Sequence, residues 1–204
     1  MPIPSRQIGW STQDNLLWQV AKQMEGVSCQ ICTTNELIGN LTGATKAYGS
    51  FYDTTDQTGA RSTVLTMKLG SVDTNATDGV SVVNDSLGNP TKITVDYTGV
   101  YDIQFSAQMV KQDGNSNTRA TIWLRKNGVD VPDSATYISF PGNSVYIVPA
   151  WNWFVQLNAG EYAQLMWHID SNVDNGLLLA SEPAGVAPVH PAVPSLIVTV
   201  NKIN

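Results

Sequence analysis

The sequence predicts a mainly β protein: an antiparallel jelly-roll sandwich preceded by a short N-terminal α-helix and an extended arm. Three observations lead to this prediction. Residues that favour strands and turns, above all Thr, Asn, Ser, Gly and Val, are abundant, whereas charged residues make up only 14% of the chain. Many short segments alternate apolar and polar residues between turn signals. An apolar period of the helical kind occurs near the N-terminus alone.

Length and charge limit the class of protein. A chain of 204 residues fits one domain, or one domain with a small appendage. The formal net charge is −6 and the Lys and Arg residues are scattered, so we expect no binding to nucleic acid. No segment is apolar enough to span a membrane, and the N-terminus lacks the continuous apolar stretch of a signal peptide. We therefore expect no membrane insertion, and synthesis in a cytoplasm.

Residues 1–26 predict an extended arm followed by a helix. Pro2 and Pro4 indicate the arm. Ser11 is the expected N-cap, with Asp14 three residues later, and Gly26 is expected to end the helix. One apolar stripe has helical spacing: Leu17, Val20, Ala21 and Met24. Because so short a helix is marginal alone in water, the stripe is expected to pack on its own β-domain, on another copy, or on a partner protein.

Residues 27–49 predict a connector rich in Thr, Gly and Asn. The connector holds both cysteines, Cys29 and Cys32, in a C-x-x-C spacing that suits a redox pair or half of a zinc site. No βαβ setting follows, and the only histidines, His168 and His190, lie far away in the sequence. We favour two small apolar residues in a packed connector, and we expect no metal site and no cofactor.

Residues 50–204 predict the sandwich. The segment from Val100 to Val110 is the clearest half-buried strand, with polar residues opposite its apolar face. Asn127-Gly128 is a strong signal for a hairpin turn, and a second turn is expected at residues 158–160. The apolar faces of the expected strands are Leu65, Met67 and Leu69; Ile93, Val95 and Tyr97; Tyr101, Ile103, Phe105, Ala107 and Met109; Ile122 and Leu124; Leu196, Val198 and Val200.

The same segments resemble the globular-head family of tumour necrosis factor and the complement recognition subcomponent. That family has a Gly-x-Tyr strand, a Lys-Asn-Gly hairpin and a Leu-x-x-Gly-Asp turn. The matching residues are Gly99, Tyr101 and Ile103 or Phe105; Lys126, Asn127 and Gly128; Leu157, Gly160 and Glu161, with Glu in place of Asp. The resemblance implies a ten-strand jelly roll that forms trimers around an apolar axis. It places Tyr101, Ile103 and Phe105 at the trimer interface; the alternative is the core of the single chain.

The N-terminal segment is similar to the start of many tailed-bacteriophage virion proteins, where it precedes variable domains. The residues that carry this likeness are Arg6, Gln7, Ile8, Gly9, Trp10, Ser11, Asn15, Leu16, Leu17, Trp18, Lys22 and Gln23. The resemblance implies a segment that docks the protein onto other virion proteins. The residues expected to dock are Arg6, Ile8, Trp10, Leu16, Leu17, Trp18, Val20 and Met24.

Two further features are candidate ligand sites. Trp151 and Trp153 fall on one face of an expected strand, where two indoles suit stacking on a sugar ring; we favour core or interface aromatics instead. The loops of residues 73–79 and 170–176 carry oxygen ligands suited to calcium, but solvated turns are the preferred interpretation. Neither histidine lies near a nucleophile motif, and no phosphate-binding loop is present, so we expect no enzyme.

These patterns together predict a structural protein of a tailed-phage virion. It is expected to form a homotrimeric peripheral knob or fibre on the tail or baseplate, docked to other virion proteins and touching a host surface glycan or protein. One alternative is a capsid decoration or head-fibre protein. The other is a secreted trimeric module that binds a carbohydrate or a receptor.

Overall fold

The computed structural model describes residues 16–27, 30, 46–112, 117–142, 144–171 and 173–204. The chain divides into two compact units, Met1–Thr45 and Lys46–Asn204. The first strand of the second unit, β1, begins at Tyr48. The units are described separately below.

The first unit contains a helix, as the sequence predicts. Residues 16–27 and residue 30 are helical, and Lys22 pairs with Glu25 one turn later, with 3.2 Å between Nζ and Oε2. The expected end of the helix at Gly26 is wrong, because the helix continues through this residue to Val27. A glycine inside a helix costs about 1 kcal/mol relative to alanine, which is too little to end a helix by itself. The predicted N-cap, Ser11, lies outside the described residues.

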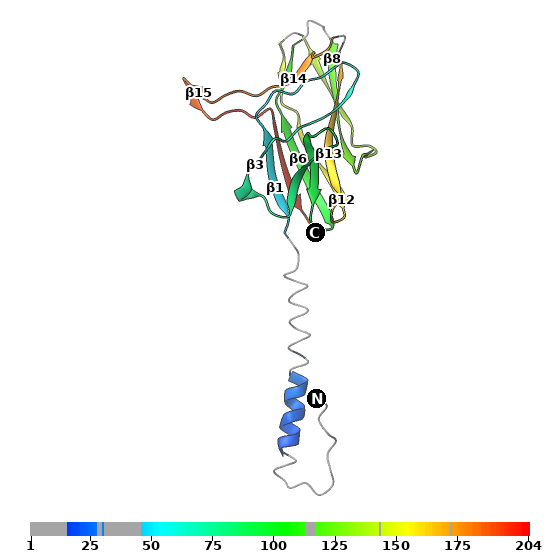
Figure 1. Ribbon diagram of the computed structural model, residues 1–204, viewed down its shortest axis with the longest axis vertical. Helices are drawn as coiled ribbons and strands as arrows, with labels where there is room; N and C mark the ends of the chain where they lie inside the picture. Colours follow the sequence, from blue (N-terminus) through cyan, green and yellow to red (C-terminus); the bar gives the residue numbers. More distant parts are fainter. Residues whose placement is uncertain (1–15, 28–29, 31–45, 113–116, 143, 172) are drawn as a thin grey trace. The chain divides into compact units, whose positions relative to one another are not determined.

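The second unit is an antiparallel sandwich of two large sheets (Figure 1). The five-stranded sheet has the order β12 (Ala150–Leu157), β6 (Gly99–Ala107), β17 (Leu196–Lys202), β1 (Tyr48–Asp53), β3 (Ser71–Val72). The seven-stranded sheet has the order β10 (Thr136–Pro141), β8 (Asn117–Lys126), β13 (Tyr162–Asp170), β5 (Pro90–Val95), β4 (Val80–Asn84). Two short strands complete it: β2 (Val64–Thr66) pairs with β13, and β9 (Val129–Asp130) pairs with β8.

The order of the strands defines a jelly roll. Among its strands of five or more residues, the chain crosses from one sheet to the other between β1 and β4, β5 and β6, β6 and β8, β10 and β12, β12 and β13, and β13 and β17. The strands β1 and β17, near the two ends of this unit, are neighbours in the five-stranded sheet, and all pairings in both sheets are antiparallel. The predicted fold class is therefore confirmed.

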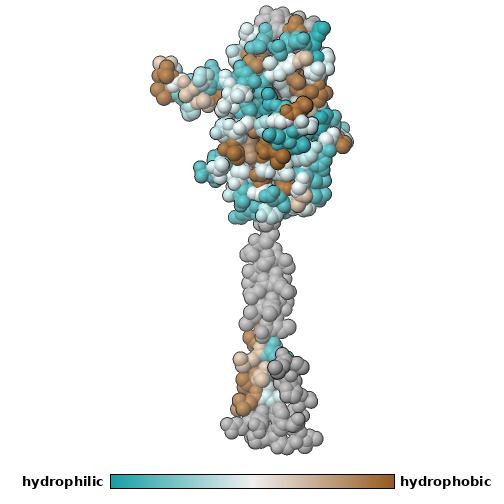
Figure 2. Space-filling model, in the orientation of Figure 1, coloured by the Kyte–Doolittle hydropathy of each residue, from teal (hydrophilic) through white to brown (hydrophobic). Residues whose placement is uncertain are grey.

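Smaller elements decorate the sandwich. A three-stranded sheet has the order β11 (Tyr146–Ile147), β7 (Met109–Lys111), β14 (Leu177–Leu179). A short 3-10 helix, η1 (Thr74–Ala76), follows β3. The strands β15 (Gly185–Val186) and β16 (Val189–His190) form a hairpin that projects away from the sandwich (Figure 1). The tip of this hairpin is apolar (Figure 2).

The core lies between the two large sheets and uses the predicted alternation. The five-stranded sheet contributes Phe51, Tyr101, Ile103, Phe105, Val155, Leu157, Leu196, Val198 and Val200. The seven-stranded sheet contributes Ile93, Val95, Ala120, Ile122, Leu124, Phe140, Ala163, Leu165, Trp167 and Ile169. Residues at alternate positions of a strand share one face, so strands such as β6 bury one side and leave the other at the surface, whereas β13 is buried on both sides from Ala163 to Trp167.

The assignment of Tyr101, Ile103 and Phe105 to a trimer interface is corrected by this packing. All three side chains are buried inside the single chain. The Tyr101 hydroxyl donates to the Tyr97 carbonyl oxygen at 2.6 Å, and burial raises the pKa of this phenol. Side chains that are at most 4% exposed have almost no surface with which to contact a second copy, so these residues belong to the core.

Candidate functional site

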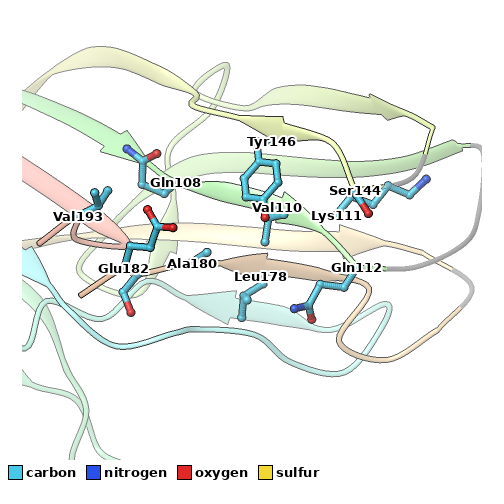
Figure 3. A pocket seen from close by; sticks show the side chains of 11 residues that line it. Gln108, Val110, Lys111, Gln112, Ser144, Tyr146, Leu178, Ala180, Glu182 and Val193 are labelled. Atoms are coloured by element: carbon cyan, nitrogen blue, oxygen red, sulfur yellow. The ribbon is translucent and has the colours of Figure 1, made fainter. Parts of the chain in front are cut away.

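A groove crosses the outer face of the three-stranded sheet and has a volume of about 540 Å³ (Figure 3). Its floor is a row of three residues on neighbouring strands. Tyr146 of β11 lies opposite Val110 of β7, which lies opposite Leu178 of β14. Residues directly opposite in antiparallel strands project on the same side. The three side chains therefore form a largely apolar strip, and Tyr146, at one end of the strip, is 76% exposed.

Polar side chains flank this strip on both sides. Gln108 and Gln112 are two residues before and after Val110, and Glu182 lies beside Gln108 (Figure 3). Within the described part of the chain, the two amides, the Glu182 carboxylate and the Tyr146 hydroxyl have no hydrogen-bond partner. Such groups are free to bond a ligand, whereas an apolar strip covers the apolar face of one. The groove suits a ligand that has both, such as a saccharide ring with its hydroxyl groups.

Two neighbouring polar groups are already engaged. The Ser181 hydroxyl donates to Asp56 Oδ1 at 2.9 Å. Lys111 is buried, and its Nζ donates to the Gly142 carbonyl oxygen at 2.6 Å. These groups stabilise the walls of the groove and are less available to a ligand.

Trp151 and Trp153 lie on one face of β12, as predicted, but that face is the inner one. The Trp153 ring stacks on Phe105 with 5.2 Å between ring centroids and 10° between planes. Trp151 meets Phe105 edge-on at 4.6 Å. The Trp153 Nε1 donates to the Ser134 carbonyl oxygen at 3.0 Å. The aromatic cluster packs against the core, which is the alternative that the sequence favoured, and it does not form an open platform for a sugar.

The outer face of the five-stranded sheet is the second candidate surface. One row across it joins Tyr52 of β1, Ile197 of β17, Ser106 of β6 and Ala150 of β12. Another joins Tyr48, Asn201, Asp102 and Phe154 in the same order. Phe154 is 66% exposed. We call these two rows the contact face. The contact face was not predicted from the sequence. Its residues occupy the positions that alternate with the predicted apolar ones on the same strands.

The strongest electrostatic feature lies at the two turns that carry the family resemblance. Glu161 Oε2 accepts from the Asn158 backbone N–H at 2.8 Å and lies 2.8 Å from Lys126 Nζ, while Glu161 Oε1 accepts from Asn127 Nδ2 at 2.8 Å. The backbone bond from Asn158, and then Lys126, lower the pKa of Glu161 to about 2. This network joins the Asn127-Gly128 hairpin, where both residues have positive φ (47° and 83°), to the turn before β13. Its role is structural.

Three carboxylates of the two candidate calcium loops bond other groups of the protein. Asp73 Oδ1 accepts from the Asn75 backbone N–H, and Asp170 pairs with Arg119 at 2.8 Å. Asp174 Oδ1 accepts from the Arg61 backbone N–H at 2.8 Å. Across the described ranges, no group of three or more His, Cys, Asp or Glu residues is placed to hold a metal ion. Cys29 and Cys32 lie outside those ranges.

The two histidines lie apart. His168 is a half-buried residue of β13, and His190 is exposed at the end of β16. In the part of the chain that the structure describes, no helix has the length and apolarity needed to cross a membrane.

The residues predicted to dock divide into two groups. Arg6, Ile8 and Trp10 lie outside the described residues. In the helix, Leu16, Leu17, Val20 and Met24 are exposed, and Trp18 is half-buried.

Comparisons with known proteins give likenesses of fold only. No family model matches the chain, and no curated protein matches it. Among solved structures, the chain is similar to the globular domain of the zebrafish complement 1qA protein, with 12% identity and a TM-score of 0.43 over 78% of this chain and 98% of that one. It is also similar to Eiger TNF from S. frugiperda, with 11% identity and a TM-score of 0.44 over 78% of this chain and 93% of that one.

Proposed function

We propose that the chain is a non-enzymatic structural protein of a tailed-phage virion, a homotrimeric knob that its N-terminal segment fastens to the particle. The contact face of the five-stranded sheet is the observation that carries this proposal. It combines two tyrosines, an isoleucine and an exposed phenylalanine with short polar residues. Large aromatic and apolar side chains exposed among polar ones on the face of a sheet are typical of a protein–protein interface.

The N-terminal unit supports the docking role. Its helix exposes Leu17, Val20 and Met24 along one stripe. A helix of about three turns gains most of its stability from packing such a stripe on a partner. The resemblance of residues 6–23 to virion proteins supports the proposal that this partner is another component of the particle.

The groove supports contact with a host surface. Its apolar strip and unpaired amides suit a neutral hexose, in which C–H groups form one face and hydroxyl groups surround it. The groove lies beyond the residues of the contact face, since β7 follows the end of β6 and β11 precedes β12. Its amide and carboxylate lining suits water or a polar ligand better than a neighbouring protomer.

The first experiment measures mass in solution, by light scattering, for the full chain and for residues 46–204. A trimer in both cases supports self-association through the sandwich and leaves the helix free to dock. A trimer of the full chain alone would move self-association to the N-terminal unit and contradict the contact face. Monomers in both cases would refute the trimeric knob.

The virion role has its own test. Mass spectrometry of density-purified phage particles from the source culture is expected to detect peptides of this chain. Labelling of such particles with an antibody against residues 46–204 then distinguishes a tail or baseplate position from the capsid decoration alternative. Purified particles that lack the chain would refute the proposal.

The groove is tested with a saccharide panel. Saturation-transfer NMR with methyl glycosides of glucose, galactose and mannose is expected to show contact with at least one sugar. Tyr146→Ala removes the exposed aromatic side of the groove and is expected to abolish that contact. Tyr137→Ala is the matched control, because Tyr137 is 67% exposed on β10 of another sheet. Equal loss in both variants, or no contact with any sugar, would refute the assignment.

A further inference from the structure

The hairpin of β15 and β16 is an arm with an apolar tip, and among the described residues its two strands pair only with each other. We define the arm as residues 182–193; its base is closed by backbone bonds in both directions between Glu182 and Val193, each 2.9 Å. Val186 and Val189 at its tip are 88% and 86% exposed. Between Pro183 and Pro194 the sequence contains no Asp, Glu, Lys or Arg. An apolar, uncharged tip that projects into water indicates a surface that another molecule covers (Figure 2).

The prolines of the arm limit the ways in which it can bind another molecule. Only two residue pairs, Gly185 with His190 and Val186 with Val189, join its strands, and so small a hairpin is marginal alone in water. Pro183, Pro188 and Pro191 have no N–H group to donate to an added strand. The arm therefore binds through its side chains rather than by extending a sheet. The fixed φ angles of these prolines also reduce the conformational entropy that the arm loses when it binds.

A complementary surface lies on the same chain. A groove of about 380 Å³ opens between β3 and β4, the edge strands of the two large sheets. Its lining contains no charged residue and consists of Phe51, Leu69, Gly70, Ser71, Val72, Thr77, Val80, Ser81, Val82 and Pro90. Val72 in this lining is 44% exposed. We call it the edge groove.

We propose that the arm of one copy inserts its valine tip into the edge groove of a neighbouring copy. This inference rests on the proposed trimer, which keeps copies at high effective concentration. The base of the arm also adjoins the three-stranded sheet, whose strands β7 and β11 continue β6 and β12 of the contact face. Arm and edge groove are different surfaces, so the contact is heterologous and closes a ring in which each copy donates one arm and accepts one.

The first test is a cross-link in the full chain, with Cys29→Ser and Cys32→Ser as background. Val186→Cys combined with Val72→Cys is expected to give covalent trimers on a non-reducing denaturing gel after mild oxidation. Val186→Cys combined with Val129→Cys is the control, because Val129 is 71% exposed on β9 and lies outside the edge groove. No cross-link between chains, a link within one chain, or equal linking in the control would overturn the proposal.

The second test measures trimer dissociation by light scattering over a dilution series. Val189→Asp is expected to raise the concentration at which the trimer dissociates by roughly tenfold or more, as expected when a buried valine contact is lost. Val129→Asp introduces the same charge and is expected to leave that concentration unchanged. A stable wild-type trimer that Val189→Asp does not weaken would overturn the arm contact alone. A monomeric wild-type chain would overturn both the arm contact and the proposed trimer.

Discussion

Two substitutions on neighbouring strands of one sheet separate the core from the contact face. Ile103→Ala changes the inner face of β6, and Phe154→Asp changes the outer face of β12. Ile103 is fully buried between Trp153 and Val200 of the adjacent strands. We expect Ile103→Ala to destabilise the sandwich and to leave a trimer, and Phe154→Asp to abolish the trimer and to leave a folded protomer.

The magnitude follows from burial. Truncation of a fully buried isoleucine costs about 2–5 kcal/mol, and the rigid neighbours of Ile103 place it at about 3–4 kcal/mol. In a domain of this size each kcal/mol lowers the Tm by about 2–4 °C, which gives a decrease of about 6–16 °C. Phe154 is mostly exposed in the protomer, so its replacement removes little buried surface from the folded chain.

The assay combines light scattering with thermal unfolding at two protein concentrations. Ile103→Ala is expected to keep the wild-type mass and a Tm that rises with concentration. Phe154→Asp is expected to have the mass of one chain, a β-type circular dichroism spectrum and a Tm independent of concentration. Tyr137→Asp, equally exposed on the seven-stranded sheet, is the control. A folded but monomeric Ile103→Ala variant, or a trimeric Phe154→Asp variant, would refute the assignment of the two faces.

Three further predictions concern the stability of the sandwich. The pKa of Glu161 is lowered from 4.5 to about 2 in the folded state, so the contribution of its carboxylate to the free energy of unfolding is complete above about pH 4.5 and is lost as the pH falls toward 2. Glu161→Gln is expected to make the free energy of unfolding in urea less dependent on pH over this range. An unchanged pH profile would contradict the network. Trp153→Phe is expected to lower the free energy of unfolding in urea by about 1 kcal/mol more than Trp151→Phe does. Trp153→Phe also removes the Nε1 bond to Ser134, whereas Trp151 Nε1 is buried without a partner in the described residues. Equal losses of stability in the two variants would contradict this. Asp53→Ala leaves the backbone N–H groups of Thr55 and Gly70 unpaired and is expected to lower the free energy of unfolding by about 2–5 kcal/mol, and a change below 1 kcal/mol would show that water replaces these bonds.

Strand periodicity predicted the sandwich because long strands such as β6 bury one face; β13, which is buried on both faces, is an exception. The alternation of Tyr101, Ile103 and Phe105 gave the correct register of β6, and the Asn127-Gly128 signal gave the correct hairpin. The two short motifs of the family resemblance also contact each other through Lys126, Asn127 and Glu161. Local patterns were sufficient here because the residues that decide the structure lie within one strand or one turn.

The groove could not be predicted in this way. Its floor combines strands of two or three residues, Met109–Lys111, Tyr146–Ile147 and Leu177–Leu179, which come from distant parts of the chain. Strands this short have no detectable alternation. The arm was missed for a related reason, since its prolines and glycine resemble a loop, and only the two pairs Gly185–His190 and Val186–Val189 join its strands into a hairpin.

The error over Tyr101, Ile103 and Phe105 has a physical cause that applies to the whole contact face. In a sandwich the most apolar face of a strand is turned toward the other sheet, because that burial stabilises the single chain. A surface that self-associates after folding must then use the opposite positions, and these remain polar enough for the free protomer to be soluble. The outer positions of β6 include Asp102, Gln104 and Ser106, and the large side chains of the contact face are spread over β1, β17 and β12. An interface of this kind has no run of apolar residues in the sequence, and it becomes visible only when strand register brings Tyr52 beside Ile197, and Phe154 into the same row as Tyr48.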